Sequence, residues 1–173
     1  MIRDQPGVPA ITIRRAVTDD APAIVSLLYE SFLEYESFYT VEGFAATVIS
    51  QSGVIDRMHA GPLFVAMMNS NLVGTVAIVT KDESLYIRGM AVHPSARGQR
   101  LGEQLLSYVE NLAKCQGARR LLLSTTPFLE RAIRLYESFG FERTDEGPYD
   151  LHGTPLFTMQ KLLVAQTSVC DSL

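Results

Sequence analysis

Residues 84–103, SLYIRGMAVHPSARGQRLGE, contain the junction that decides the fold of this chain. The segment predicts a strand over Ser84–Val92, a break at a proline and then a short loop that leads directly into a long helix. The first turn of a helix presents unpaired backbone N–H groups and the positive end of the helix dipole. Gly98 and Gly102 lack side chains at this turn, so a bulky anion can approach the backbone closely. The junction therefore predicts a binding site for phosphate or diphosphate.

The charge of this junction differs from the charge of the whole chain. The 173 residues include 15 Lys and Arg against 19 Asp and Glu, which gives a formal net charge of −4 at pH 7. From Arg88 to Arg100, in contrast, there are three arginines and no acidic residue. An acidic chain disfavours nucleic acid and anionic membranes as partners, because both select proteins with excess Lys and Arg. The sequence thus predicts one basic pocket for a small phosphorylated ligand.

The hydrophobic pattern on either side of the junction predicts a single α+β domain in the order βααβββαβαββ. We expect this domain over residues 10–163, with a leader at 1–9 and a C-terminal tail at 164–173. The expected strands are Ala10–Ala16, Leu63–Met68, Leu72–Thr80, Ser84–Val92, Arg119–Thr125, a short one after Phe141 and Leu156–Leu163. The expected helices run from about Thr18 to Glu34 and over Val41–Ser50, Gln99–Cys115 and Phe128–Ser138, with an irregular stretch between Ser50 and Gly61.

The remaining composition indicates a cytoplasmic protein without a metal. Cys115 and Cys170 are too few and too far apart for a Cys-ligated zinc site, and we expect both to be free thiols in a reducing cytosol. The three histidines lack the spacing of metal ligands. The longest apolar runs are far shorter than a membrane span, and prolines interrupt the N-terminal segment where a signal peptide needs an unbroken apolar stretch.

Two common phosphate-binding motifs fit the junction poorly. A P-loop ends in Gly-Lys-Ser/Thr, whereas Gly102 is followed by Glu103. The dinucleotide-binding fingerprint follows the first strand of a βαβ unit, whereas this junction follows an antiparallel run. Taken alone, the residues also permit an ordinary helix start with packing glycines and solvated arginines.

Three segments together resemble a known family. VHPSARGQRLGEQLL, residues 92–106, resembles motif A of the GCN5-related N-acetyltransferases (GNAT), whose pattern is Arg or Gln, two residues, Gly, one residue, then Gly or Ala. Arg97 and Gly102 match its ends, and Arg100 replaces the inner glycine. AIRLYESFGF, residues 132–141, is similar to motif B, and ITIRRAVTDDAPAIVSLL, residues 11–28, to the usual first strand and helix. The resemblance covers about residues 11–163 and implies the GNAT fold, a three-layer arrangement with a mixed, mostly antiparallel sheet between helices.

The resemblance also implies a site for acetyl-CoA as co-substrate. In this family the pantetheine arm lies between diverging strands and bonds to main chain, a role that falls on Met90, Ala91 and Val92, with Gly89 suited to a bulge. The diphosphate is expected on backbone N–H groups of Arg97, Gly98, Gln99, Arg100, Leu101 and Gly102.

The family comparison assigns a general acid but no general base. Tyr136 matches the tyrosine commonly assigned to protonating the coenzyme A thiolate, although it also fits an apolar helix stripe. Leu129 stands where many members have a cofactor-binding asparagine, and Thr125 or Thr126 could compensate. The conceivable bases are Glu30, Glu34, Glu36, Glu83, Tyr86 and His152.

The function implied is transfer of an acetyl group from acetyl-CoA to a primary amine, by direct attack in a ternary complex. A small-molecule amine is the expected acceptor, and carboxylates around the first two helices are compatible with a cationic one. The alternatives are a protein or peptide N-acetyltransferase and a non-catalytic acyl-CoA-binding module. We expect no nucleic-acid or membrane partner, and a homodimer is one assembly to consider.

Overall fold

A computed structural model of the chain describes residues 9–165. A seven-stranded sheet in the order β1-β2-β3-β4-β5-β9-β6 forms its centre, and only the β4–β5 pair within it is parallel. The strands are β1 (Ile11–Arg15), β2 (Leu63–Met68), β3 (Asn71–Lys81), β4 (Ser84–Val92), β5 (Arg120–Thr125), β6 (Glu142–Thr144) and β9 (Phe157–Leu162), with a separate hairpin of β7 (Asp150–Leu151) and β8 (Thr154–Pro155). The expected mixed, mostly antiparallel sheet is confirmed.

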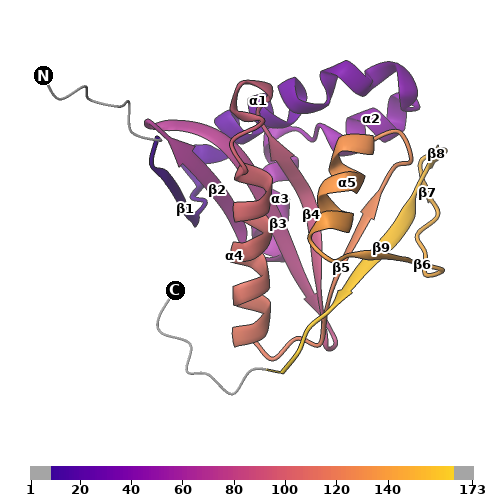
Figure 1. Cartoon of the computed structure of the whole chain (residues 1–173). Helices are drawn as coiled ribbons and strands as arrows, with labels where there is room; N and C mark the ends of the chain where they lie inside the picture. Colours follow the sequence, from indigo (N-terminus) through magenta and orange to yellow (C-terminus); the bar gives the residue numbers. More distant parts are fainter. Residues whose placement is uncertain (1–8, 166–173) are drawn as a thin grey trace, which may run out of the picture.

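Helices cover both faces of the sheet, which makes three layers (Figure 1). On one face, α4 (Leu101–Cys115) and α5 (Glu130–Ser138) contribute to a large apolar cluster. On the other, α1 (Ala21–Phe32) and α3 (Gln51–Ala60) share a smaller cluster with the opposite side of the strands. Successive side chains of a strand point to opposite faces of the sheet, and in β2 Phe64 accordingly packs in the first cluster and Val65 in the second. The remaining helical segments are α2 (Val41–Thr47) and the 3-10 turns η1 (Thr18–Asp20), η2 (Leu33–Phe38) and η3 (Pro94–Ala96).

The expectation of an irregular stretch before Gly61 is wrong, because α3 occupies most of these residues. Ser50 caps this helix by accepting a hydrogen bond from the Gly53 backbone N–H at 3.2 Å. Only Val54 is fully buried, so the helix lacks the wide apolar stripe that reveals a helix in sequence. Helix α2 correspondingly ends at Thr47 rather than Ser50. The β7–β8 hairpin was also missed.

Two further expectations need correction. Cys115 takes part in a disulfide bond, so the expectation of a free thiol at this position is wrong, while Cys170 lies outside the described residues. Of the expected leader and tail, only residues 9, 164 and 165 are described. No helix in the described part of the chain is both long and apolar enough to cross a membrane.

Helix α4 begins at Leu101, two residues later than expected, because Arg100 has a left-handed backbone with φ 60° and ψ 21°. A side chain disfavours this conformation, whereas glycine adopts it readily. Arg100 therefore stands at the position of the family's inner glycine and has a backbone conformation that glycine adopts readily. Its side chain is exposed and pairs with Glu103 at 2.8 Å.

Replacing Arg100 with glycine should therefore give a more stable protein than replacing it with alanine, by about 1 kcal/mol. Both changes remove the pairing with Glu103, so their difference isolates the backbone effect. Urea unfolding of the two variants measures it. Equal stability would show that residue 100 does not hold a left-handed conformation in solution.

Candidate active site

Strands β4 and β5 separate partway along their length. Their parallel register runs from Ser84 opposite Arg120 to Ile87 opposite Leu123 and then stops. Beyond this point β4 stays paired with β3 as far as Val92, and β5 stays paired with β9 as far as Thr125. The backbone of β4 after Ile87 therefore borders a gap in the centre of the sheet.

A β-bulge accompanies this separation. Arg88 lies opposite Ala77 and Ala91 lies opposite Thr75, so β4 has one extra residue between these pairs. Gly89 has φ 58°, which meets the expectation that this glycine suits a bulge. The extra residue changes which side chains face which layer. Ile87 and Met90, three positions apart, both pack in the cluster under α4, while Ala91 faces α1 and α3.

A cavity of about 520 Å³ opens at this gap. Of the residues expected to bind the cofactor or act in catalysis, all but Gln99 line it, namely Met90, Ala91, Val92, Arg97, Gly98, Arg100, Leu101, Gly102 and Tyr136. Strand β4, the loop before α4 and helix α5 contribute these residues, which brings the two sequence motifs to one place.

The two glycines of the loop have different roles. Gly98 has φ 79°, and a Cβ built on it would meet nothing within 4 Å, so this position borders open space. A Cβ on Gly102 would instead lie 2.6 Å from Leu135 Cδ2. Close approach of an anion is therefore possible at Gly98, whereas Gly102 is needed for the packing of α5 against the start of α4.

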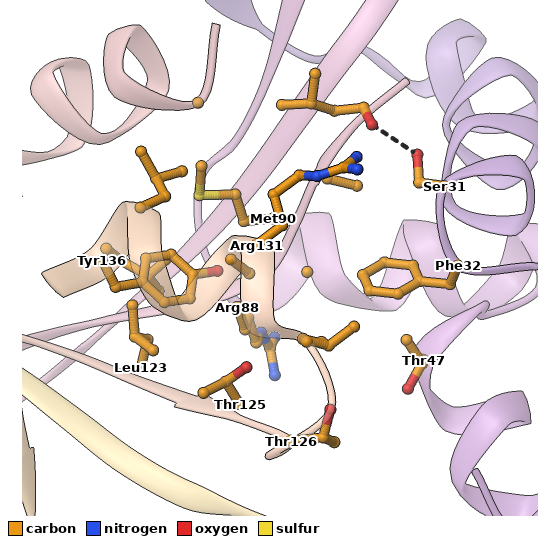
Figure 2. Close-up of a pocket in the computed structure, with 18 of the residues that line it drawn as sticks. Ser31, Phe32, Thr47, Arg88, Met90, Leu123, Thr125, Thr126, Arg131 and Tyr136 are labelled. Carbon is orange, nitrogen blue, oxygen red and sulfur yellow. Dashed lines mark hydrogen bonds between the residues drawn. The ribbon is translucent and has the colours of Figure 1, made fainter. Parts of the chain in front are cut away.

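The side chain of Arg97 holds this loop against the first helix. Its guanidinium donates to the Glu34 carboxylate and, at 3.2 Å, to the Ser31 carbonyl. Ser31 Oγ in turn donates to the Val92 carbonyl at 3.3 Å (Figure 2). The Arg97 charge is already paired, and its backbone N–H donates to the Pro94 carbonyl at 3.4 Å, so this residue mainly positions the loop against the first helix.

Most of the conceivable general bases lie away from the cavity. Glu34 pairs with Arg97, and Glu30 pairs with His93. The cavity lining includes none of Glu30, Glu34, Glu36, Glu83 and His152, and it does include Tyr86. The Tyr86 hydroxyl lies 2.5 Å from Ser124 Oγ. The carboxylates around the first two helices thus do not form the cavity wall.

Tyr136 is buried on α5 with its hydroxyl pointing into the cavity (Figure 2). Its ring packs against Phe141 with centroids 5.9 Å apart. Burial raises the pKa of Tyr136 to about 12, and the nearby Tyr39 adds to this effect. The hydroxyl makes no hydrogen bond with any residue in the range 9–165. It is therefore protonated at neutral pH and available as a donor to a ligand.

Arginines dominate the charge of the cavity. The lining includes one acidic residue, Glu103, and five arginines. The arginines are Arg57 on α3, Arg88 on β4, Arg97 and Arg100 in the loop, and Arg131 on α5. Arg97 and Arg100 are paired with carboxylates, whereas the other three form no ion pair within residues 9–165. Sequence reasoning included Arg88 in the basic junction but missed Arg57, because α3 itself was not expected.

The end of the cavity beyond β5 carries hydroxyls and aromatic rings. The Thr126 Oγ1 atom is buried and has no hydrogen-bond partner among the described residues. Leu129, which directly precedes α5, lines the cavity as well. The ring of Phe128 contacts that of Tyr39 with centroids 4.8 Å apart. Burial raises the pKa of Tyr39, while the nearby Thr47 hydroxyl opposes this rise.

This combination of a splayed mixed sheet, a loop leading into a helix and a tyrosine at the gap defines the acyl-CoA N-acyltransferase fold. The solved PaiA N-acetyltransferase of Thermoplasma acidophilum, in complex with coenzyme A, has this fold with a TM-score of 0.77 at 18% identity, covering 89% of this chain and 99% of that one. The profile of the acetyltransferase (GNAT) family matches residues 22–141, and this chain belongs to that family. The expectation of an acetyltransferase-class enzyme is confirmed.

Curated relatives include proteins with different acceptors. An IAA acetyltransferase of Azospirillum brasilense is 36% identical over 91 residues, which cover 51% of this chain and 58% of that protein. An aminoalkylphosphonate N-acetyltransferase of Salmonella typhimurium is 28% identical over 153 residues, covering 83% of this chain and 93% of that protein. Family membership therefore leaves the acceptor open.

The bulge can be tested with matched glycine variants. Gly89→Ala and Gly98→Ala both place a side chain on a left-handed backbone, which costs about 1–2 kcal/mol. The Cβ of Gly89→Ala would also lie 2.1 Å from Arg57 Nη1, but this atom ends a flexible side chain that can shift, and Gly98 faces open space, so the two variants should lose similar stability. Urea unfolding measures both losses. A loss below about 0.5 kcal/mol in Gly89→Ala would contradict a left-handed backbone at the bulge.

Proposed function

We propose that this protein transfers the acetyl group of acetyl-CoA to a small primary amine within a ternary complex. The observation that supports this most directly is the position of the buried Tyr136 hydroxyl, which points into the cavity where β4 and β5 separate. The same cavity reaches the loop before α4. One continuous space thus joins a place for phosphates to a proton donor.

The cofactor is assigned to residues of β4 and the loop. After Ile87, the edge of β4 that faces the gap has lost its strand partner, so the backbone of Met90, Ala91 and Val92 can bond to an extended amide chain as an added strand would. Gly98 and Arg100 have positive φ values at the start of α4, where the backbone N–H groups that lack helical partners are available to an anion. Acetyl-CoA supplies an extended chain with two amides, a diphosphate and the reactive thioester.

The chain's own groups then serve the acyl transfer. A backbone N–H near Met90 stabilises negative charge on the thioester carbonyl oxygen, while the acceptor nitrogen forms the new C–N bond and the C–S bond breaks. Tyr136 donates its proton to the departing thiolate, and water returns to it the proton that the acceptor nitrogen loses as the amide forms. A thiol has a pKa near 8.5, so the tyrosine keeps its proton until the sulfur becomes anionic.

The acceptor ammonium must also lose a proton. Among the described residues, the cavity wall has one carboxylate, that of Glu103, and it is paired with Arg100. We therefore assign this step to water. Of the conceivable bases, Tyr86 is the one whose side chain lines the cavity. A small acceptor is supported by the Salmonella typhimurium relative, whose name specifies an aminoalkylphosphonate.

A turnover assay tests the proposal. Acetyl-CoA is incubated with small amines, amino acids and lysine peptides, and free thiol is measured. We expect release with small amines that exceeds the release with peptides, and we expect acetyl-CoA to raise the melting temperature by mass action. Thermal stabilisation without thiol release from any acceptor would support the non-catalytic binding module, and preference for peptides would support the protein acetyltransferase.

Tyr136→Phe should lower kcat about 100-fold or more, with little change in the Kd of acetyl-CoA, because it removes a proton donor and leaves the ring. Since burial raises the pKa of Tyr136 to about 12, the wild-type kcat should show no descending limb up to pH 10. Tyr108→Phe is the matched control, because Tyr108 packs on Phe64 outside the cavity lining. Unchanged turnover in Tyr136→Phe would remove the general-acid assignment.

A further inference from the structure

Two of the cavity arginines carry positive charge that no described residue neutralises. Arg57 extends from α3 to the bulge of β4, where a Cβ on Gly89 would lie 2.1 Å from its Nη1 atom. Arg88 lies in β4 beside this glycine, and its Nε atom is buried without a hydrogen-bond partner. Neither guanidinium has an ion pair within the described part of the chain.

This arrangement is unfavourable for the protein without a ligand. Burial of an unpaired charge carries a desolvation penalty, and two neighbouring positive charges repel each other. Both effects lower the pKa of Arg57 to about 10, burial being the larger and the charge of Arg88 the smaller. A bound anion between the two guanidinium groups would remove both penalties.

The diphosphate of acetyl-CoA is an unsuitable candidate for this anion. Its proposed loop leads into α4, on the face of the sheet where Ile87 is packed. Adjacent side chains of a strand point to opposite faces, so Arg88 points toward the layer of α1 and α3, from which Arg57 also comes. The arginine pair thus lies on the other side of β4 from the loop.

The surroundings of the pair add a further hydrogen-bond donor. The Arg88 guanidinium extends toward the end of the cavity where Thr125 and Thr126 lie (Figure 2). The Thr126 hydroxyl there is buried and has no partner among residues 9–165. Guanidinium and hydroxyl groups together suit the oxygens of a carboxylate or a phosphonate.

We propose that the acceptor is a small amine that also carries an acidic group, a carboxylate or a phosphonate, and that Arg57 and Arg88 bind this group. The proposal rests on the proposed acetyltransferase function and specifies its substrate class. With its anion held at the arginines, the acceptor places its amine toward the gap between β4 and β5. Thr126 contributes a hydrogen bond to the same anion.

The same charges affect the reacting amine. A nearby positive charge lowers the pKa of an ammonium group, because it disfavours the charged form. In an acidic acceptor, the arginine pair offsets the negative charge that would otherwise raise the ammonium pKa, in a cavity whose one carboxylate among the described residues is already paired. It also disfavours acceptors with a second positive charge, such as diamines.

Competing acceptors of similar size test this proposal. The probes are 2-aminoethylphosphonate, β-alanine, uncharged propylamine and dicationic putrescine, each assayed for kcat/KM by thiol release. We expect at least about a 10-fold preference for the two acidic amines over propylamine, since a charged hydrogen bond contributes that much or more. The comparison of 2-aminoethylphosphonate with β-alanine distinguishes a phosphonate site from a carboxylate site.

Arginine variants connect the preference to the structure. Arg57→Gln and Arg88→Gln should each lower the ratio of kcat/KM for acidic over neutral acceptors by about 10-fold, with little change in the Kd of acetyl-CoA. Because each change relieves repulsion or a buried unpaired charge, the melting temperature should stay the same or rise. If the arginine only stabilised the fold, its replacement would instead lower the melting temperature. Arg119→Gln is the control, since Arg119 is 76% exposed and pairs with Glu83 at the opposite end of β4.

The outcomes separate this inference from the proposed function. If propylamine or putrescine is turned over as well as the acidic amines or better, the acidic acceptor is wrong and the acetyltransferase function stands. The same conclusion follows if neither arginine variant changes the ratio of kcat/KM for acidic over neutral acceptors. Absence of thiol release with every amine overturns the proposed function. In that case, calorimetry of 2-aminoethylphosphonate and β-alanine with the coenzyme A complex decides the arginine site. The arginine site is supported if these compounds bind and Arg57→Gln or Arg88→Gln weakens their binding. It is refuted if they do not bind or if neither variant affects their binding.

Discussion

The divergence of β4 from β5 is the constraint on which the site depends. Up to Ile87 the two strands share a parallel ladder, and beyond it each keeps a different neighbour. The bulge at Gly89 lets β4 diverge without losing β3, since it adds one residue to β4 alone. The resulting gap frees a strand edge, admits the Tyr136 hydroxyl and joins the two faces of the sheet in one cavity.

The charges around this gap fall into two groups. Arg97 and Arg100 are paired with Glu34 and Glu103, so they stabilise the loop before α4 and its contact with the first helix. Arg57 and Arg88 lack such partners in the described part of the chain. Paired arginines contribute to structure, whereas unpaired, partly buried ones lower stability unless a ligand binds.

Sequence reasoning succeeded where the signal was local. The strand, loop and helix of the junction were expected from a few adjacent residues, and so was the bulge at Gly89. It failed where the signal was weak or distant. Helix α3 buries only Val54 completely, so its periodicity is faint, and Arg57 was missed with it. The free thiol expected at Cys115 was wrong, because whether a cysteine forms a disulfide depends on what the fold brings close to it.

The sequence by itself determined the family, the order of most elements and the position of the loop before α4, because backbone preferences and hydrophobic periodicity act over short distances. Only the tertiary structure decided which charges are neutralised. Glu34 is 63 residues from Arg97 and yet pairs with it, while Arg57 and Arg88 come from different layers and meet without a counterion. Electrostatic interactions depend on separation and burial in space, and these quantities exist only after the chain has folded.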